Sequence, residues 1–272
     1  MKFYWQYSFT LILGLAIFIP EQGQSLPKAQ EQTHIANAVG HLNFVPPPPP
    51  VDLGIPGDRT GAGRRGCMTS DRNLANNSKQ LTALVPITAS ARSKVVWGLT
   101  TATHPTFLFY VPYRAQDVHS AKFVLRTTDD QLIYQTRVTL PQSPGVISLS
   151  LPQSVTALTE GKPYHWYFNI YCAERKPPTA VVHGWVQRKA VTLTLQQQLA
   201  QATPQGRSEL YFANGIWYDA VTTLADLHHR NPNDIRLAQQ WAEVLKFVGL
   251  DAIASEPISS CCNMMQQVRK EL

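Results

Sequence analysis

The clearest alternation of apolar and polar positions in the chain runs from residue 164 to residue 172. Successive side chains of a β-strand point to opposite faces of its sheet, so residues two apart share a face. The alternation separates an apolar set from a more polar one: Tyr164, Trp166, Phe168, Ile170 and Cys172 against His165, Tyr167, Asn169 and Tyr171. This pattern predicts a central strand whose apolar face lies in a core.

Further segments rich in strand-favouring residues lie before and after it, separated by turn formers. The predicted strands are 80–88, 105–111, 122–126, 132–140, 146–151, 164–172 and 181–188, with 94–99 as an additional edge strand. Leu158, Gly161 and Tyr164 have the spacing of a tyrosine corner, in which a Tyr hydroxyl bonds back to the preceding turn. We therefore predict a mainly β fold with α-helices, in which residues 80–194 form an immunoglobulin-like or fibronectin-like antiparallel β-sandwich.

The apolar period changes to about three and a half after residue 191, which predicts helices. They are expected at 195–202, 207–213 and 218–230, followed by a helix that Asn233 or Asp234 caps and Gly249 ends. Residues 218–234 resemble the second helix of a tetratricopeptide repeat, with matching residues at Ala220, Leu224, Leu227 and Pro232. We expect this tetratricopeptide-like region, 195–256, to pack on the sandwich and bury Trp217, Leu224, Trp241 and Leu245, with a polar tail at 257–272.

The N-terminus has the pattern of an export signal. Lys2 precedes an apolar run at 9–19, and Pro20 is followed by small residues at Gly23 and Ser25. This predicts a signal peptide at 1–25. The run is shorter than the roughly 20 residues of a spanning helix, although an uncleaved anchor is the alternative. We expect a periplasmic or secreted protein with no stable membrane span after cleavage.

Residues 26–79 are rich in Pro, Gly and Arg and predict a linker without a core of its own. The five prolines at 46–50 favour an extended polyproline II rod, either a spacer or a docking site for a proline-binding domain. Gly61, Gly63 and Gly66 have the spacing of a dinucleotide-binding loop. No strand precedes them and no helix pattern follows, so no nucleotide site is predicted.

Charge and cysteine content add two expectations. The formal net charge of +6 comes from Lys and Arg spread along the chain, and no basic helix indicates nucleic-acid binding. Export places the cysteines in an oxidising compartment. We predict a disulfide between Cys67 and Cys172; Cys172 as a buried free thiol, or bound to Cys261 or Cys262, is the alternative.

Few residues invite a catalytic or metal-binding interpretation. His228 and His229 are adjacent, so on a helix their side chains point about 100° apart and suit a charged helix cap better than a metal. His165 and His183 are expected to face one another across strands, without a carboxylate to complete a metal site. Asp219 is explained as a helix-surface residue or a helix-start dipole partner. No catalytic residue, cofactor or metal is predicted, and the chain is not expected to be an enzyme.

Tyr167 and Tyr171 lie opposite the apolar face of the central strand, and one sandwich core cannot bury both faces. The C-terminal helices, another protein or a stacked glycan must therefore cover them. We interpret the two tyrosines as a partner surface. The expected function is that of a non-catalytic exported envelope protein, a protein- or glycan-binding or scaffold module. An envelope hydrolase with dispersed carboxylates is the alternative.

Several long motifs carry a resemblance to a known family: GLT, PTFLFYVPY, YQTRVTLPQSPGVISLSLP, GKPYHWYFNIYC, HGWVQR and NGIWYDAVTTLADL. They resemble an uncharacterised family of exported cyanobacterial proteins, the domain of unknown function 928. The resemblance covers about residues 53–250 and implies a shared fold and an envelope location. It implies no activity, ligand or catalytic residue.

Overall fold

The computed structural model describes residues 2, 44–50, 53, 57–61, 67, 79–89 and 94–259. The chain divides into two units, Met1–Val39 and Gly40–Leu272, and the fold is that of the second unit. Several predictions concern residues outside the described ones. They are the signal segment, of which only Lys2 is described, the glycines Gly63 and Gly66, and the cysteines Cys261 and Cys262.

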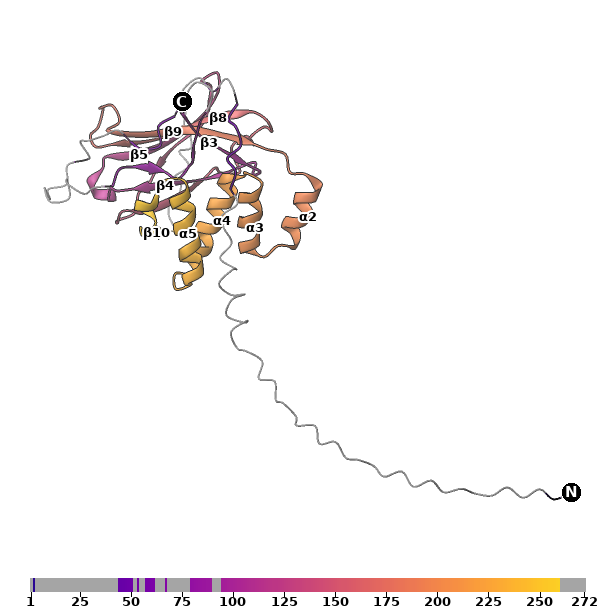
Figure 1. Cartoon of the computed structure of the whole chain (residues 1–272). Helices are drawn as coiled ribbons and strands as arrows, with labels where there is room; N and C mark the ends of the chain where they lie inside the picture. The colour runs from indigo at the N-terminus through magenta and orange to yellow at the C-terminus, as the bar shows by residue number, and fades with distance from the viewer. Residues whose placement is uncertain are drawn as a thin grey trace, which may run out of the picture. The chain divides into compact units, whose positions relative to one another are not determined.

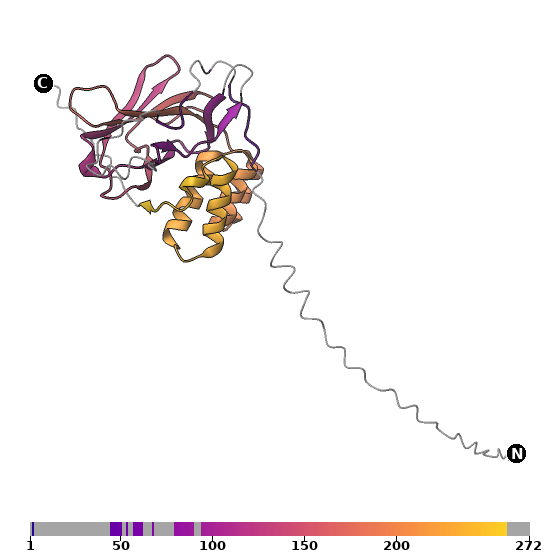
Figure 2. The same cartoon turned by 60° about the vertical axis from the view of Figure 1, so that its left-hand side comes forward.

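Two β-sheets face each other across the main core (Figures 1 and 2). The smaller sheet has the order β1 (Thr82–Ala83), β4 (Thr106–Val111), β7 (Gly145–Ser150) and β10 (Ile258–Ser259). The larger sheet has the order β2 (Ile87–Ala89), β3 (Lys94–Thr100), β9 (Ala180–Arg188), β8 (Pro163–Tyr171), β5 (Ser120–Thr127) and β6 (Leu132–Val138). Most strand pairs are antiparallel. The pairs β3–β9 and β7–β10 are parallel, which differs from the predicted antiparallel sandwich.

Aromatic side chains from both sheets fill the space between them. The ring of Phe109 on β4 stacks on Phe168 of β8, with 4.6 Å between centroids, and lies edge-on to Trp166 at 5.5 Å. Phe107 packs against Phe123 of β5 at 5.0 Å. These residues are at most 1% exposed. The predicted inward face of the central strand is confirmed, since residues two apart on β4, β5 and β8 all reach this core.

Two predicted strands differ from the observed ones. The segment 80–88 does not form one strand: β1 and β2 belong to different sheets, with Pro86 between them, which has no amide hydrogen for a ladder. The segment 94–99 forms β3, which is not an edge strand but lies between β2 and β9. The polar tail expected from residue 257 begins instead with β10, and the Val146 amide donates to the Pro257 carbonyl oxygen at 2.8 Å.

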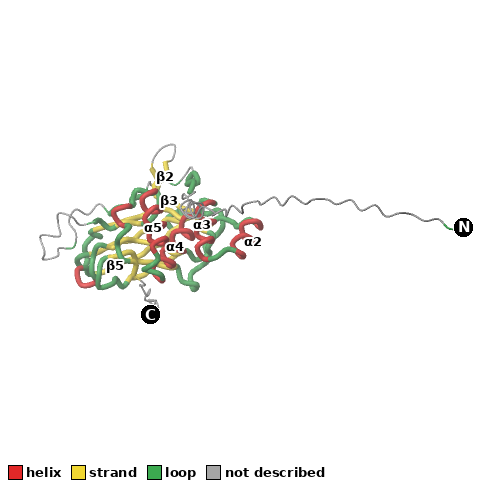
Figure 3. Tube along the Cα trace, turned by 60° about the horizontal axis from the view of Figure 1, so that its bottom comes forward, coloured by secondary structure: helices red, strands yellow, loops and turns green. Residues whose placement is uncertain are grey.

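Four α-helices follow β9: α2 (Leu193–Gln201), α3 (Pro204–Ala213), α4 (Trp217–Arg230) and α5 (Ile235–Phe247). The side chain of Asp234 caps α5 by accepting from the Arg236 amide, and Gly249 follows α5 with a left-handed φ of +69°. Figure 3 shows the helices side by side. Among the described residues, none of these helices has the length and apolar character needed to cross a bilayer.

The helices pack on the inner face of the larger sheet, beside β4 (Figure 1). Trp217, Leu224, Trp241 and Leu245 are fully buried, as expected. At Gly98 on β3, a Cβ atom would lie 3.0 Å from the Tyr218 ring, so the missing side chain lets α4 approach closely. The helices therefore extend the layer that the smaller sheet begins.

Described residues of the expected linker also pack on the domain, at 44–50, 53 and 57–61, so this part of it is not a free linker. Phe44 is 4% exposed, and its ring lies 5.0 Å from that of Trp217. The Pro47 carbonyl oxygen accepts a hydrogen bond from Trp97 Nε1 at 3.1 Å, so part of the proline run lies on β3 instead of acting as a free spacer. The Arg59 guanidinium donates to the Val248 carbonyl oxygen at 2.6 Å, at the C-terminal end of α5.

Candidate functional site

The two faces of β8 have different surroundings. Its inner side chains contact the smaller sheet and α4: Trp166 Nε1 donates to the Tyr218 hydroxyl at 2.8 Å, and that hydroxyl donates to the Trp185 carbonyl oxygen at 3.0 Å. The helices therefore cover the inner face, and the alternative in which they cover Tyr167 and Tyr171 is wrong. Both tyrosines lie on the opposite face and are half-buried.

Strand register places further side chains around the tyrosines. Lys122 of β5 pairs with Asn169 of β8, and on the other side of β5 it pairs with Arg137 of β6. Because alternate residues share a face, these three lie on the same face as Tyr167 and Tyr171. We call these five residues the outer tyrosine face. Lys122 and Asn169 are half-buried and Arg137 is exposed, so the surface is polar, aromatic and cationic.

Two histidines hold Tyr167 in place. His165 Nε2 lies 3.0 Å from His183 Nδ1, and the Tyr167 hydroxyl lies 2.9 Å from His165 Nδ1. The Tyr167 ring also stacks on His183, with 5.4 Å between centroids. These contacts confirm that the two histidines face one another across β8 and β9. They leave Tyr167 with little rotational freedom, which reduces the entropy it would lose on binding a ligand.

The electrostatics of this cluster do not favour acid–base catalysis. Burial, together with the neighbouring His183, lowers the pKa of His165 to about 3. Burial also lowers the pKa of His183 and raises that of Tyr167. A general base works best with a pKa near the operating pH, so a His165 that is neutral and weakly basic is better suited to positioning. Among the described residues, no three His, Cys, Asp or Glu side chains gather as a metal site.

The β3 and β9 end of the same sheet face is covered. A separate buried apolar cluster lies there: Leu53, Val95, Trp97, Leu99 and Trp185. The Pro47 carbonyl oxygen also reaches this cluster, through its hydrogen bond from Trp97. His165 stacks on Trp185 at 4.1 Å between centroids, so it marks the border of this cluster. The outer tyrosine face lies on the other side of that border, over β8, β5 and β6.

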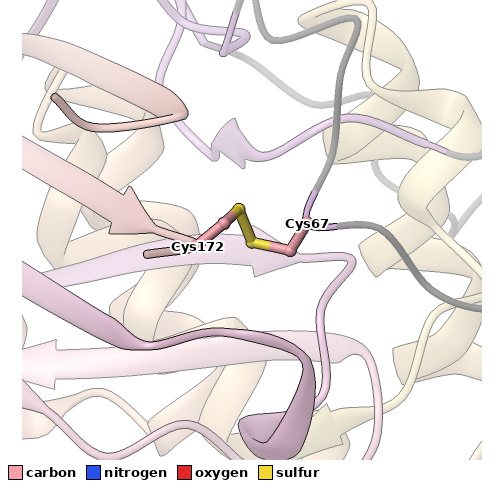
Figure 4. Close-up of a disulfide and its surroundings, with 2 residues drawn as sticks. All are labelled: Cys67 and Cys172. Atoms are coloured by element: carbon pink, nitrogen blue, oxygen red, sulfur yellow. A yellow bond between two sulfur atoms is a disulfide. The ribbon is translucent and has the colours of Figure 1, made fainter. Parts of the chain in front are cut away.

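A disulfide joins Cys67 to Cys172, as predicted (Figure 4). Cys172 directly follows β8, and therefore lies next to Tyr171 in the chain. The bond fixes residue 67 at this end of the strand, across a sequence separation of 105 residues. The outer tyrosine face is thus bounded by a covalent link at one end and by the histidines at the other.

Asp219 is not on a helix surface. It lies in the first turn of α4, and its carboxylate accepts hydrogen bonds from the Thr100 hydroxyl at 2.7 Å, the Thr101 hydroxyl at 2.6 Å and the Thr101 amide at 3.1 Å. Burial raises its pKa, although these hydrogen bonds oppose the shift. Asp219 fastens α4 to the end of β3. The sequence predicted that Asp219 lies at a helix start. It did not predict the hydrogen-bond partners Thr100 and Thr101, because they are 119 and 118 residues away in sequence.

The other candidates have structural surroundings. His228 lies in the last turn of α4 near Trp241, at 6.3 Å between ring centroids, and burial followed by the nearby His229 lowers its pKa, which disfavours the charged form expected of a helix cap. The Gly61 amide donates to the Leu81 carbonyl oxygen at 2.8 Å, which places Gly61 beside a strand segment and not at a helix start. Sequence reasoning did not identify Lys122 and Arg137; their positions on alternating strands 122–126 and 132–140 were the available signal.

The chain matches no curated protein, but it does match a protein-family model. The family model described as Domain of Unknown Function (DUF928) matches residues 60–258, which cover both sheets from β1 to β10 and all four helices. That family is the one the sequence motifs resemble. The chain therefore belongs to the DUF928 family.

Proposed function

We propose that this chain is a non-catalytic, exported envelope protein that binds a glycan through its outer tyrosine face. The observation that carries the proposal is the position of α4 on the inner face of the larger sheet, because it leaves Tyr167 and Tyr171 without helix cover. The two tyrosines are four residues apart on one strand, about 13 Å along its axis. Two aromatic rings at this separation, of which the histidines hold Tyr167 in place, suit stacking against an extended oligosaccharide.

The composition of the face favours a glycan over a protein partner. Among the well-exposed large apolar side chains of the described residues, Leu132 alone lies on β5, β6 or β8. The centre of a protein–protein interface is usually apolar and poor in charge. Here Asn169 lies between the two tyrosines on β8 and Lys122 lies beside it on β5, and such groups hydrogen-bond readily to sugar hydroxyls.

Export to an oxidising compartment is part of the proposal. The Cys67–Cys172 disulfide supports it, because such bonds persist in the periplasm or outside the cell and are rare in a reducing cytosol. The N-terminal signal pattern agrees with this location. We expect the mature chain to begin near Leu26.

We extend the proposal to the fold relationship. The Thr159 amide donates to the Tyr164 hydroxyl at 3.1 Å, and this bond supports an immunoglobulin-like origin with its tyrosine corner. Buried Ala220 and Leu224 on α4 agree with a tetratricopeptide-like helix pair. The Asp219 carboxylate already accepts hydrogen bonds from three donors, two hydroxyls and one backbone amide, and this supports a non-catalytic protein over the dispersed-carboxylate hydrolase.

The test separates glycan, protein and enzyme. The immobilised mature protein is incubated separately with the polysaccharide and the protein fractions of the source envelope. We expect retention of polysaccharide and at least a tenfold loss of retention in Tyr167→Ala/Tyr171→Ala. Phe247→Ala, which removes an exposed ring on α5, should bind as wild type. Retention of protein alone, or an unaffected double variant, would overturn the proposal. Shortening of the polysaccharide during incubation would favour the hydrolase instead.

A further inference from the structure

Lys122 and Arg137 are directly opposite one another on neighbouring strands. Side chains in such a pair have Cβ atoms about 5 Å apart, and like charges at that position destabilise a sheet. In the part of the chain that the structure describes, neither residue forms an ion pair with a carboxylate. The fold thus keeps two adjacent cations whose repulsion it does not compensate.

The charges around the pair leave the outer tyrosine face positive. Arg126, two rows along β5, pairs with Asp130 of the β5–β6 turn, with Nη1 and Oδ2 3.3 Å apart, so these two charges largely cancel. Asp58 lies against β9 through mutual backbone hydrogen bonds with His183, on the far side of the histidine cluster. Lys122 and Arg137 therefore set the sign of the potential beside Asn169 and Tyr171.

Building on the proposed function, we infer that the glycan is an acidic polysaccharide whose carboxylate or sulfate groups lie between Lys122 and Arg137. An anion in that position pairs with both cations at once and removes their repulsion. The neighbouring sugar rings stack on Tyr171 and Tyr167, and Asn169 hydrogen-bonds to hydroxyls between them. Charge selects the polymer, and the tyrosines provide contact with any sugar ring.

The experiment compares matched polymers that differ only in charge. Binding of the mature protein is measured by calorimetry against polygalacturonate and its fully methyl-esterified form, and against dextran sulfate and dextran. At least one acidic polymer should bind tenfold or more tightly than its neutral counterpart, and its affinity should fall as salt rises. Lys122→Gln/Arg137→Gln should lose at least tenfold in affinity and show a weaker salt dependence. Arg236→Gln/Lys246→Gln, with the same charge change on α5, should stay within twofold of wild type.

Stability measurements separate a binding role from a structural one. The Lys122→Gln/Arg137→Gln protein should melt no lower than wild type, because its repulsion is gone. Equal affinity for acidic and neutral polymers would overturn the inference while leaving the proposed function intact. An unaffected double variant, or binding to neither polymer pair, would also overturn it. Binding to anionic phospholipid vesicles or duplex DNA in place of the polymers would assign the cation pair to another partner and contradict the inference.

Discussion

Buried and half-buried polar side chains in this protein connect segments that are far apart in sequence. Asp219 is the clearest case, because its carboxylate satisfies two hydroxyls and one backbone amide at the end of β3. Removing a carboxylate from such a site leaves buried donors without partners, which costs more than the loss of an exposed hydrogen bond.

We predict that Asp219→Ala lowers the free energy of unfolding by about 3 kcal/mol. Urea denaturation at neutral pH measures it. The control is Asp226→Ala, which removes an exposed pair with Arg230 on the same helix and should cost at most about 0.5 kcal/mol. Equal effects of the two substitutions would contradict the assignment of Asp219 as an anchor.

The histidine cluster predicts a pH dependence of stability. The pKa of His165 is lowered on folding, to about 3, and that of His183 is lowered as well. The unfolded chain therefore binds more protons than the folded one between about pH 6.5 and pH 3, and stability falls as pH falls through that window. The groups facing the pair are Tyr167, Arg126 and Asp58.

Each histidine should contribute a slope of up to about 1.4 kcal/mol per pH unit to the free energy of unfolding. Urea unfolding between pH 7 and pH 4.5 measures this slope, and His165→Gln should flatten it. A wild-type protein as stable at pH 4.5 as at pH 7, or a variant with an unchanged slope, would show that the cluster does not remain neutral.

At the scale of the elements, close strand packing limits what β9 tolerates. A Cβ atom at Gly184 would lie 2.6 Å from the Trp166 ring and 2.7 Å from the Val96 carbonyl oxygen. Gly184→Ala should therefore destabilise the protein by about 3 kcal/mol, because backbone must move. Gly206→Ala on α3 meets nothing closer than 3.3 Å and should be neutral or stabilising by up to about 1 kcal/mol. Thermal unfolding of both variants checks the contrast, and a tolerated Gly184→Ala would contradict this packing.

Local sequence patterns predicted most of these elements. The errors concern which elements lie beside one another, because that depends on contacts between residues far apart in sequence. The period of two located β8 and its two faces, since side-chain direction depends only on strand geometry. The position of the helices was not predictable, because it depends on how closely α4 approaches Gly98 across the sheet. The parallel neighbour of β3 was missed for the same reason: nothing near residues 94–99 records that β9 lies beside it. Predicting that Lys122 and Arg137 lie opposite one another would have required the register of β5 and β6, which the sequence alone does not give.

At the scale of the whole molecule, the Cys67–Cys172 bond joins segments 105 residues apart. In the chain-entropy model, closing a loop of this length stabilises the folded state by up to about 4.7 kcal/mol. We predict that a reductant lowers the free energy of unfolding by 2–5 kcal/mol (roughly the range for native disulfides). Cys67→Ser/Cys172→Ser should be equally weakened and insensitive to reductant. If the reductant left the free energy of unfolding of the wild-type protein unchanged, that would contradict a stabilising Cys67–Cys172 disulfide.

Hydrogen exchange tests the outer tyrosine face as a binding surface most directly. Backbone amide exchange is followed by mass spectrometry with and without the retained envelope polysaccharide. We predict slower exchange in the strands β5 (Ser120–Thr127), β6 (Leu132–Val138) and β8 (Pro163–Tyr171). We expect no change in α2 to α5, which lie on the other face. Protection confined to those helices, or to the loop 231–234 between α4 and α5, would contradict a binding role for this face.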